Sequence, residues 1–178
     1  QLHTAASNFA SDAELIGDVI EEGAGIGLAL CDLDGDGLAE VAYTQRTQLT
    51  LHDAPLTDFD HSDPDAALVV HAEAALEVRC VGDVDGDGAE EMAVQSRFAR
   101  EVDVFLVSWV TGTATLEEAA DTRFAHQGNT LSAMHVSQTT GDVDGDGSPD
   151  LLLTLPTASF EMSEALRAGG GAWIFLGE

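Results

Sequence analysis

Three stretches decide the fold of this chain: DLDGDGLAE at residues 32–40, DVDGDGAEE at residues 83–91 and DVDGDGSPD at residues 142–150, called loops 1, 2 and 3 below. Each places carboxylates at positions 1, 3, 5 and 9 and glycine at positions 4 and 6. Because glycine adopts positive φ without a steric penalty, the backbone can curl until alternate carboxylates converge on one point. Such a point suits a hard cation, and Ca²⁺ takes six to eight oxygen ligands in flexible geometry.

The pattern predicts three Ca²⁺ sites, each using the side chains at positions 1, 3, 5 and 9 and the carbonyl at position 7, with water completing the shell. Without metal, the crowded carboxylates should raise each other's pKa values. Ion binding and local folding are therefore expected to be coupled. The expected ligands are Asp32, Asp34, Asp36, Leu38 and Glu40 in loop 1, Asp83, Asp85, Asp87, Ala89 and Glu91 in loop 2, and Asp142, Asp144, Asp146, Ser148 and Asp150 in loop 3.

Other interpretations of the loops fit less well. Asp-Gly is a common turn dipeptide, so one copy could be a solvated acidic turn, but three copies with the same nine-residue spacing argue against it. Mg²⁺ demands stricter octahedral geometry, and no Cys/His cluster has the spacing of a zinc site. An EF-hand needs a glutamate at loop position 12 and flanking helices. Position 12 is Tyr43, Val94 and Leu153, and the flanks are short apolar segments typical of strands.

Each loop is therefore predicted to be the turn of a β-hairpin. The order strand, DxDGDGxx(D/E), strand, GAP-like turn and GxxYVF-like strand resembles FG-GAP repeats, the blades of the integrin α-subunit β-propeller and of many bacterial surface proteins. Ile26-Gly27 stands at the FG position, Leu155-Pro156-Thr157 at the GAP position of the third repeat, and GGAWIFLG at residues 170–177 resembles the strand that follows. The resemblance covers nearly the whole chain. It implies an all-β fold of four-stranded antiparallel propeller blades, with the calcium ligands on the loop positions named above.

The spacing of the loops, roughly 50 to 60 residues, fits one four-stranded blade per interval. We expect a single segment over residues 1–178 with blades at about 18–72, 73–120 and 121–178, and with residues 10–18 as a fourth strand completing another blade. In the second blade the strands are expected near 75–81, 91–95, 102–109 and 113–116.

Three blades are too few for a ring, since propellers typically have four to eight. The chain could be a fragment of a longer propeller, half of a ring made by two copies, or an open arc. Bare blade edges invite pairing with other strands, which favours a fragment or an assembly.

Two longer segments interrupt the repeat and are candidate recognition surfaces. Residues 55–65 (PLTDFDHSDPD) are expected to be a solvated acidic loop, with a further cation or ligand site as the alternative. Residues 157–170 (TASFEMSEALRAGG) are expected to form a single helical turn that covers a blade edge, with a ligand clamp as the alternative.

The composition restricts the partners. The chain has 33 acidic residues, six arginines, no lysine and a net charge of −27. This balance argues against nucleic acid, which needs a basic footprint, and against electrostatic attachment to anionic membranes.

The compartment is indicated by the expected ions more than by the cysteines. Extracellular calcium modules bind at about 10⁻⁴ to 10⁻³ M, so a secreted or cell-surface location is expected. Cys31 and Cys80 precede loops 1 and 2 on the innermost strands of neighbouring blades and could lie near each other, but a disulfide requires Cα atoms within about 7 Å. Two buried free thiols are the expectation, with a disulfide as the alternative. No signal peptide or transmembrane run is present, and a start at Gln1 suggests a processed or excised piece.

The sequence favours a calcium-stabilised module that recognises a protein or carbohydrate ligand, with Ca²⁺ in a structural role, as in cell adhesion. The alternative is a non-catalytic accessory propeller domain of a secreted enzyme. Intrinsic catalysis is disfavoured, because the chain has no G-x-S-x-G, H-E-x-x-H or P-loop motif. Further partners would be a second copy of the chain or the remaining blades of a longer one.

Overall fold

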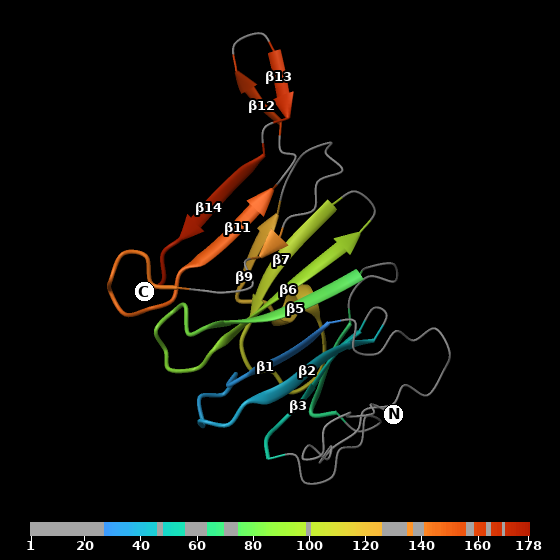
Figure 1. The fold of residues 1–178 in the computed structure, drawn as a ribbon. Helices are drawn as coiled ribbons and strands as arrows, with labels where there is room; N and C mark the ends of the chain where they lie inside the picture. The colour runs from blue at the N-terminus through green and yellow to red at the C-terminus, as the bar shows by residue number, and fades with distance from the viewer. Residues whose placement is uncertain are drawn as a thin grey trace, which may run out of the picture.

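The computed structural model describes residues 27–45, 48–55, 64–69, 75–98, 101–125, 135–136, 141–155, 159–162, 165–168 and 170–178. Within these ranges the regular secondary structure is mostly β-strand, arranged mainly in antiparallel sheets, with one short helix. The expectation of a β-rich, antiparallel architecture is confirmed. The described sheets stack as layers and do not close into a ring (Figure 1).

The first sheet contains loop 1. Strands β1 (Leu28–Cys31), β2 (Glu40–Gln45), β3 (Gln48–His52) and β4 (Ala66–Val69) follow one another in antiparallel order. A fifth strand, β8 (Gly112–Thr115), lies parallel to β4 and reaches this sheet from much later in the chain.

The second sheet contains loop 2 and has four antiparallel strands. They are β5 (Ala75–Gly82), β6 (Glu91–Phe98), β7 (Glu101–Val107) and β9 (Thr122–Ala125), in that order. Between β8 and β9 the chain forms the helix α1 (Leu116–Ala119), which a capping box begins. The chain thus leaves the second sheet after β7, adds β8 to the first sheet and returns through α1 to β9.

The third sheet contains loop 3. It consists of β10 (His135–Val136), β11 (Leu151–Leu155) and β14 (Gly171–Phe175), all antiparallel. A separate two-stranded hairpin, β12 (Ser159–Met162) and β13 (Ala165–Ala168), projects from the end of this sheet (Figure 1).

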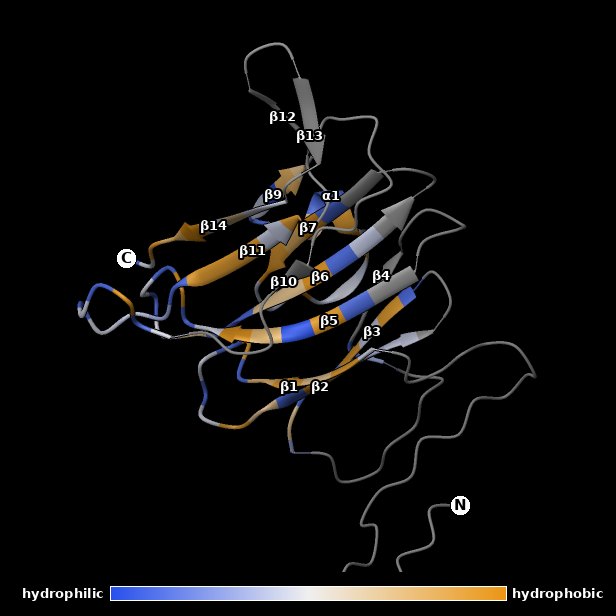
Figure 2. Ribbon diagram, turned by 45° about the horizontal axis from the view of Figure 1, so that its top comes forward, coloured by the Kyte–Doolittle hydropathy of each residue, from blue (hydrophilic) through white to orange (hydrophobic). Residues whose placement is uncertain are grey.

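Two apolar cores bind the three sheets together, with the second sheet in the middle. Alternate side chains of β7 enter opposite cores, because successive side chains of a strand point to opposite faces. Phe105 and Val107 pack with residues of the first sheet, and Val104 and Leu106 pack with residues of the third. This double burial explains the apolar run at residues 104–107 in β7. Figure 2 shows hydrophobic segments concentrated on strands of the stack such as β11.

Two expectations about these elements are wrong. Residues 113–116 were expected to complete the second blade, but the strand there, β8, pairs with β4 of the first sheet, and β9 is the fourth strand of the second. The segment 157–170 was expected to hold a helical turn, but it contains the β12–β13 hairpin. Phe160 and Met162 stand two residues apart, which is the repeat of a strand.

The expected strand within residues 10–18 and most of the acidic segment 55–65 lie outside the described residues.

A substitution in the core shared by the first two sheets should show how much the layers depend on it. Val94→Ala removes two carbon atoms from a side chain with no solvent exposure, and we expect a loss of about 2 kcal/mol in the free energy of unfolding. Val143→Ala, at a site 64% exposed, is the matched control and should change stability by less than about 0.5 kcal/mol. Urea denaturation measures both, and equal effects would contradict this description of the core.

Candidate metal centre

The three loops lie along one edge of the molecule, on the left in Figure 1. Each joins two antiparallel neighbours, so that Cys31 pairs with Glu40 across loop 1 and Gly82 with Glu91 across loop 2. Across loop 3 a single bridge joins Gly141 to Asp150. The prediction that each loop is the turn of a hairpin is confirmed.

The same hydrogen bonds shape all three loops, as loop 2 illustrates. The N–H of Gly88 at position 6 donates to Asp83 Oδ2 at 3.0 Å, and the N–H of Asp87 donates to Asp85 Oδ1 at 3.2 Å. The N–H of Ala89 donates to Asp87 Oδ1 at 2.8 Å. Loops 1 and 3 repeat these three bonds at the same positions.

Both glycines of every loop adopt positive φ, for example 75° at Gly86 and 99° at Gly88. These angles are strained for other residues, so the glycine spacing in the sequence directly encodes the curl of the loop.

The carboxylate at position 9 closes each loop by accepting a hydrogen bond from the N–H at position 2. The N–H of Leu33 donates to Glu40 Oε2 at 2.6 Å, that of Val84 to Glu91 Oε2 at 2.7 Å and that of Val143 to Asp150 Oδ2 at 2.6 Å. In loops 1 and 2 the residue at position 9 is the first residue of a strand, and in loop 3 it is Asp150, which pairs with Gly141 in the bridge. The hairpin therefore fixes this carboxylate against the loop.

The carboxylates converge as the sequence predicts, most completely in loop 2. Asp83, Asp85, Asp87 and Glu91 each offer an oxygen atom, and these four oxygens lie within 4.8 Å of one another. In loops 1 and 3 the aspartates at positions 1, 3 and 5 likewise have oxygens within 4.8 Å of one another. The structure thus brings together ten of the twelve expected carboxylate ligands in three separate clusters, one in each loop, and leaves Glu40 and Asp150 at position 9 outside them.

Loops 1 and 2 contain carboxylate oxygens that are buried without a partner among the described residues. They are Glu40 Oε1 and Asp32 Oδ1 in loop 1 and Glu91 Oε1 in loop 2. Glu40 has no exposure to solvent, and Glu91 is 2% exposed. A buried polar atom without a hydrogen-bond partner costs free energy, so these oxygens are the atoms that an additional partner, such as a cation, would stabilise.

Burial also disfavours the charged forms of these two glutamates. Desolvation raises the pKa of Glu91 to about 7, with a smaller upward effect from Asp85, Asp83 and Asp87, while the N–H of Val84 opposes the rise. Desolvation likewise raises the pKa of Glu40. A bound cation would favour the ionised forms.

Loop 3 differs at position 9, where aspartate replaces glutamate. Both oxygens of Asp150 accept hydrogen bonds, Oδ2 from Val143 and Oδ1 from the N–H of Gly177 at 3.0 Å. At position 1, the N–H groups of Gly145 and Gly147 lower the pKa of Asp142. Loop 3 therefore satisfies its carboxylates with the protein's own donors more fully than loops 1 and 2 do.

A comparison with models of known protein families and with curated proteins finds no match. The chemistry of the donor sets therefore carries the functional argument. In the described part of the chain, no helix has the length and apolar character needed to cross a membrane.

The donor set fits a hard divalent cation. All the side-chain donors are carboxylates, which suit Ca²⁺ and Mg²⁺ better than softer metals, and buried oxygens in two loops lack any other partner. Such an ion would supply positive charge that offsets the repulsion among the carboxylates. The residues of each loop would hold it, and the two strands would transmit the resulting rigidity to the sheet.

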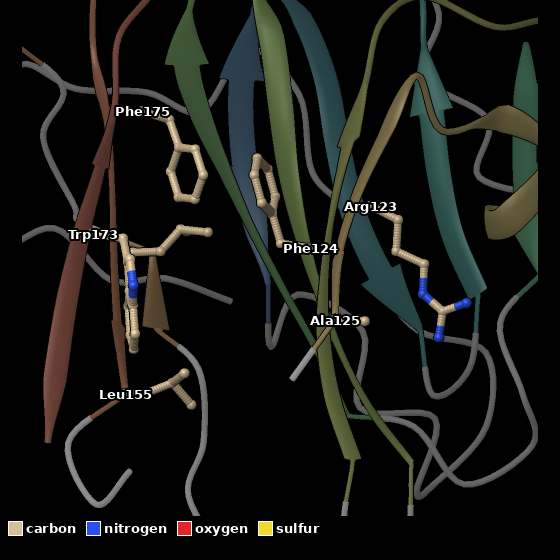
Figure 3. A pocket seen from close by; sticks show the side chains of 7 residues that line it. Arg123, Phe124, Ala125, Leu155, Trp173 and Phe175 are labelled. Atoms are coloured by element: carbon tan, nitrogen blue, oxygen red, sulfur yellow. The ribbon is translucent and has the colours of Figure 1, made fainter. Parts of the chain in front are cut away.

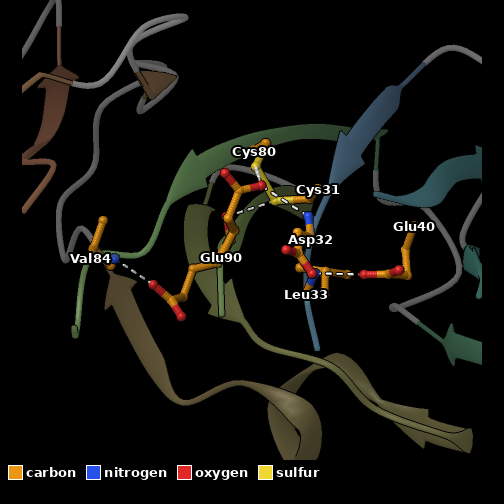
Figure 4. The surroundings of a disulfide bond; sticks show 8 residues. Cys31, Asp32, Leu33, Glu40, Cys80, Val84 and Glu90 are labelled. Carbon is orange, nitrogen blue, oxygen red and sulfur yellow. Dashed lines mark hydrogen bonds between the residues drawn. A yellow bond between two sulfur atoms is a disulfide. The ribbon is translucent and has the colours of Figure 1, made fainter. Parts of the chain in front are cut away.

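The cysteines form a disulfide, contrary to the expectation of free thiols. Cys31 at the end of β1 and Cys80 in β5 have Cα atoms 5.3 Å apart, within the range for a disulfide. The bond joins the first and second sheets directly beside loops 1 and 2 (Figure 4). The sequence places each cysteine just before a loop, but the distance between them depends on how the two sheets pack.

An open cavity of about 360 Å³, which the sequence did not suggest, lies between β9 and the strands β11 and β14. At its edge the rings of Phe124 and Phe175 pack against each other, with centroids 4.6 Å apart and planes tilted by 53° (Figure 3). The guanidinium of Arg123 points away from Phe124 and pairs with Asp103. The lining residues are Arg123, Phe124, Ala125, Leu153, Leu155, Trp173 and Phe175.

Proposed function

We propose that this chain is a calcium-binding β-propeller segment in which each loop holds one Ca²⁺ ion in a structural role. The observation that carries the proposal is the burial of unpartnered carboxylate oxygens on Glu40 and Glu91 within converging acidic loops. An ion coordinated there would give these oxygens a partner and would offset the repulsion among the carboxylates. Ca²⁺ is preferred to Mg²⁺ because it accepts many protein oxygens in irregular geometry.

The sheets are proposed to be neighbouring blades. In support, the second sheet has four antiparallel strands, the number expected of a blade, and its two faces pack against the first and third sheets. Because propellers have four to eight blades, further blades from a longer chain or from a second copy would complete the ring.

The proposed role of the ions is to stiffen the hairpins of a module that recognises a protein or carbohydrate ligand on a secreted or cell-surface protein. The net charge of −27 disfavours nucleic acid as that ligand. The disulfide supports the location, since disulfides persist mainly in oxidising compartments.

Calcium titration of metal-free protein tests the proposal. We expect three equivalents to bind by calorimetry, and each site to stabilise the fold by about 2.7 kcal/mol at a free calcium concentration 100 times its Kd. The site in loop 3 should be the weakest, because Asp150 already has two hydrogen-bond donors. Mg²⁺ at the same concentration should stabilise less.

Asp85→Asn serves as the control. It should abolish binding of the Ca²⁺ ion at loop 2 and leave binding at loop 3 unchanged. A melting temperature that does not respond to removal and return of calcium would contradict the proposal.

A further inference from the structure

Glu90 occupies the eighth position of loop 2, where loop 1 has Ala39 and loop 3 has Pro149. The shared hydrogen bonds that shape the loops do not use this side chain. The converging oxygens of loop 2 come from positions 1, 3, 5 and 9 and do not include Glu90. The carboxylate of Glu90 therefore has no role within loop 2 itself.

The contacts of Glu90 lie on loop 1 instead (Figure 4). Its N–H donates to the carbonyl of Asp32 at 2.7 Å, and its Oε2 accepts from the N–H of Asp32 at 2.9 Å. Both backbone polar groups of Asp32 are thus held by one residue of the neighbouring loop. The same Oε2 lies 3.1 Å from the sulfur of Cys80, beside the disulfide.

Asp32 is the first expected ligand of loop 1, and its side chain is set for that role. Oδ2 accepts a hydrogen bond from the N–H of Gly37 at 3.0 Å, while Oδ1 is buried without a partner. Because the backbone of Asp32 fixes where Oδ1 lies, a residue that holds this backbone controls the position of a ligand atom.

The two loops are also in close backbone contact. A Cβ atom added to Gly35 in loop 1 would lie 3.0 Å from the carbonyl oxygen of Gly88 in loop 2. Loop 2 therefore packs directly against loop 1. Glu90 is the residue of loop 2 that hydrogen-bonds to Asp32, an expected metal ligand of loop 1.

We propose that Glu90 is a positioning residue for the calcium site of loop 1, although it belongs to loop 2 in the sequence. The inference rests on the proposed calcium binding. Partners in the second coordination shell orient the ligands of metal sites, and their loss typically lowers metal affinity 10- to 100-fold.

Three substitutions separate positioning from charge. Glu90→Ala removes the acceptor and the charge, and should weaken calcium binding at loop 1 by about 10-fold or more. Glu90→Gln keeps an acceptor oxygen for the N–H of Asp32 and should restore affinity to within a few-fold of the original protein. Glu90→Asp keeps the charge but shortens the reach, and should remain weak. Glu77→Ala, on β5 and half exposed, is a control for the loss of one charge.

Calcium titrations followed by NMR can resolve the sites separately. The backbone amides of Gly37, Gly88 and Gly147 each donate to the position 1 aspartate of their own loop, so their resonances report loops 1, 2 and 3. We expect Glu90→Ala to shift only the Gly37 titration to higher calcium.

The outcomes distinguish the two proposals. If none of the three resonances responds to calcium in the original protein, the proposed function fails. If they respond but Glu90→Ala leaves the Gly37 titration unchanged, or Glu90→Gln is as weak as Glu90→Ala, the positioning role is overturned. Should Glu90→Ala not fold, the contrast between Glu90→Gln and Glu90→Asp decides the same question.

Discussion

Reduction of the disulfide between Cys31 and Cys80 is expected to lower the free energy of unfolding by about 4 kcal/mol. The cysteines are 49 residues apart in the sequence, and closing a loop of that length restricts the unfolded chain by about this amount in the chain-entropy description. The bond also joins two sheets that otherwise meet through side-chain packing and the hydrogen bonds between Glu90 and Asp32.

Denaturant unfolding with and without a reducing agent, in saturating calcium, measures the effect. The Cys31→Ala/Cys80→Ala variant should resemble the reduced protein and should not respond to the reductant. A difference below about 1 kcal/mol would show that the bond adds little beyond the packing of the two sheets.

Stability in calcium-free buffer is expected to fall as the pH rises from about 4.5 to about 7, because of Glu91. Burial raises the pKa of this carboxyl to about 7 in the folded protein, against an ordinary value of 4.5. In this interval the folded state binds more protons than the unfolded state, so raising the pH disfavours folding. The resulting loss in the free energy of unfolding from Glu91 reaches at most about 3 kcal/mol at pH 7, and there is no such loss below pH 4.5.

Saturating calcium should remove this fall, because the ion favours the ionised carboxylate. Urea denaturation at pH 5, 6 and 7 measures the profile, and the difference between the original protein and Glu91→Gln isolates this group from the other carboxylates. Identical pH profiles for the two proteins in calcium-free buffer would contradict the assigned role of burial.

The loops could be predicted from the sequence because their geometry is local. Glycines such as Gly86 and Gly88 encode the curl, and the hydrogen bonds from Gly88 and Ala89 span only a few residues. The flanking strands were predictable for the same reason, since apolar runs such as β6 and β11 bound the loops directly.

The features that the sequence did not predict depend on contacts between distant segments. The residues of β8 were expected to form a strand, but nothing local distinguishes pairing with β4 from pairing with β7. The disulfide and the contact of Glu90 with Asp32 both depend on how the first two sheets pack. The burial that raises the pKa of Glu91 arises from the same packing.

The path of the chain through β8 has a consequence for protein engineering. A cut between loops 1 and 2 would separate β1–β4 from β8, the strand that lies along β4. A fragment carrying only the first repeat would expose that edge of β4, and one carrying only the second would carry β8 without its neighbour. A transplanted unit therefore needs at least the pair of repeats spanning residues 27–125, with the disulfide inside it, and new cover for Val104 and Leu106, which the third sheet buries in the whole protein.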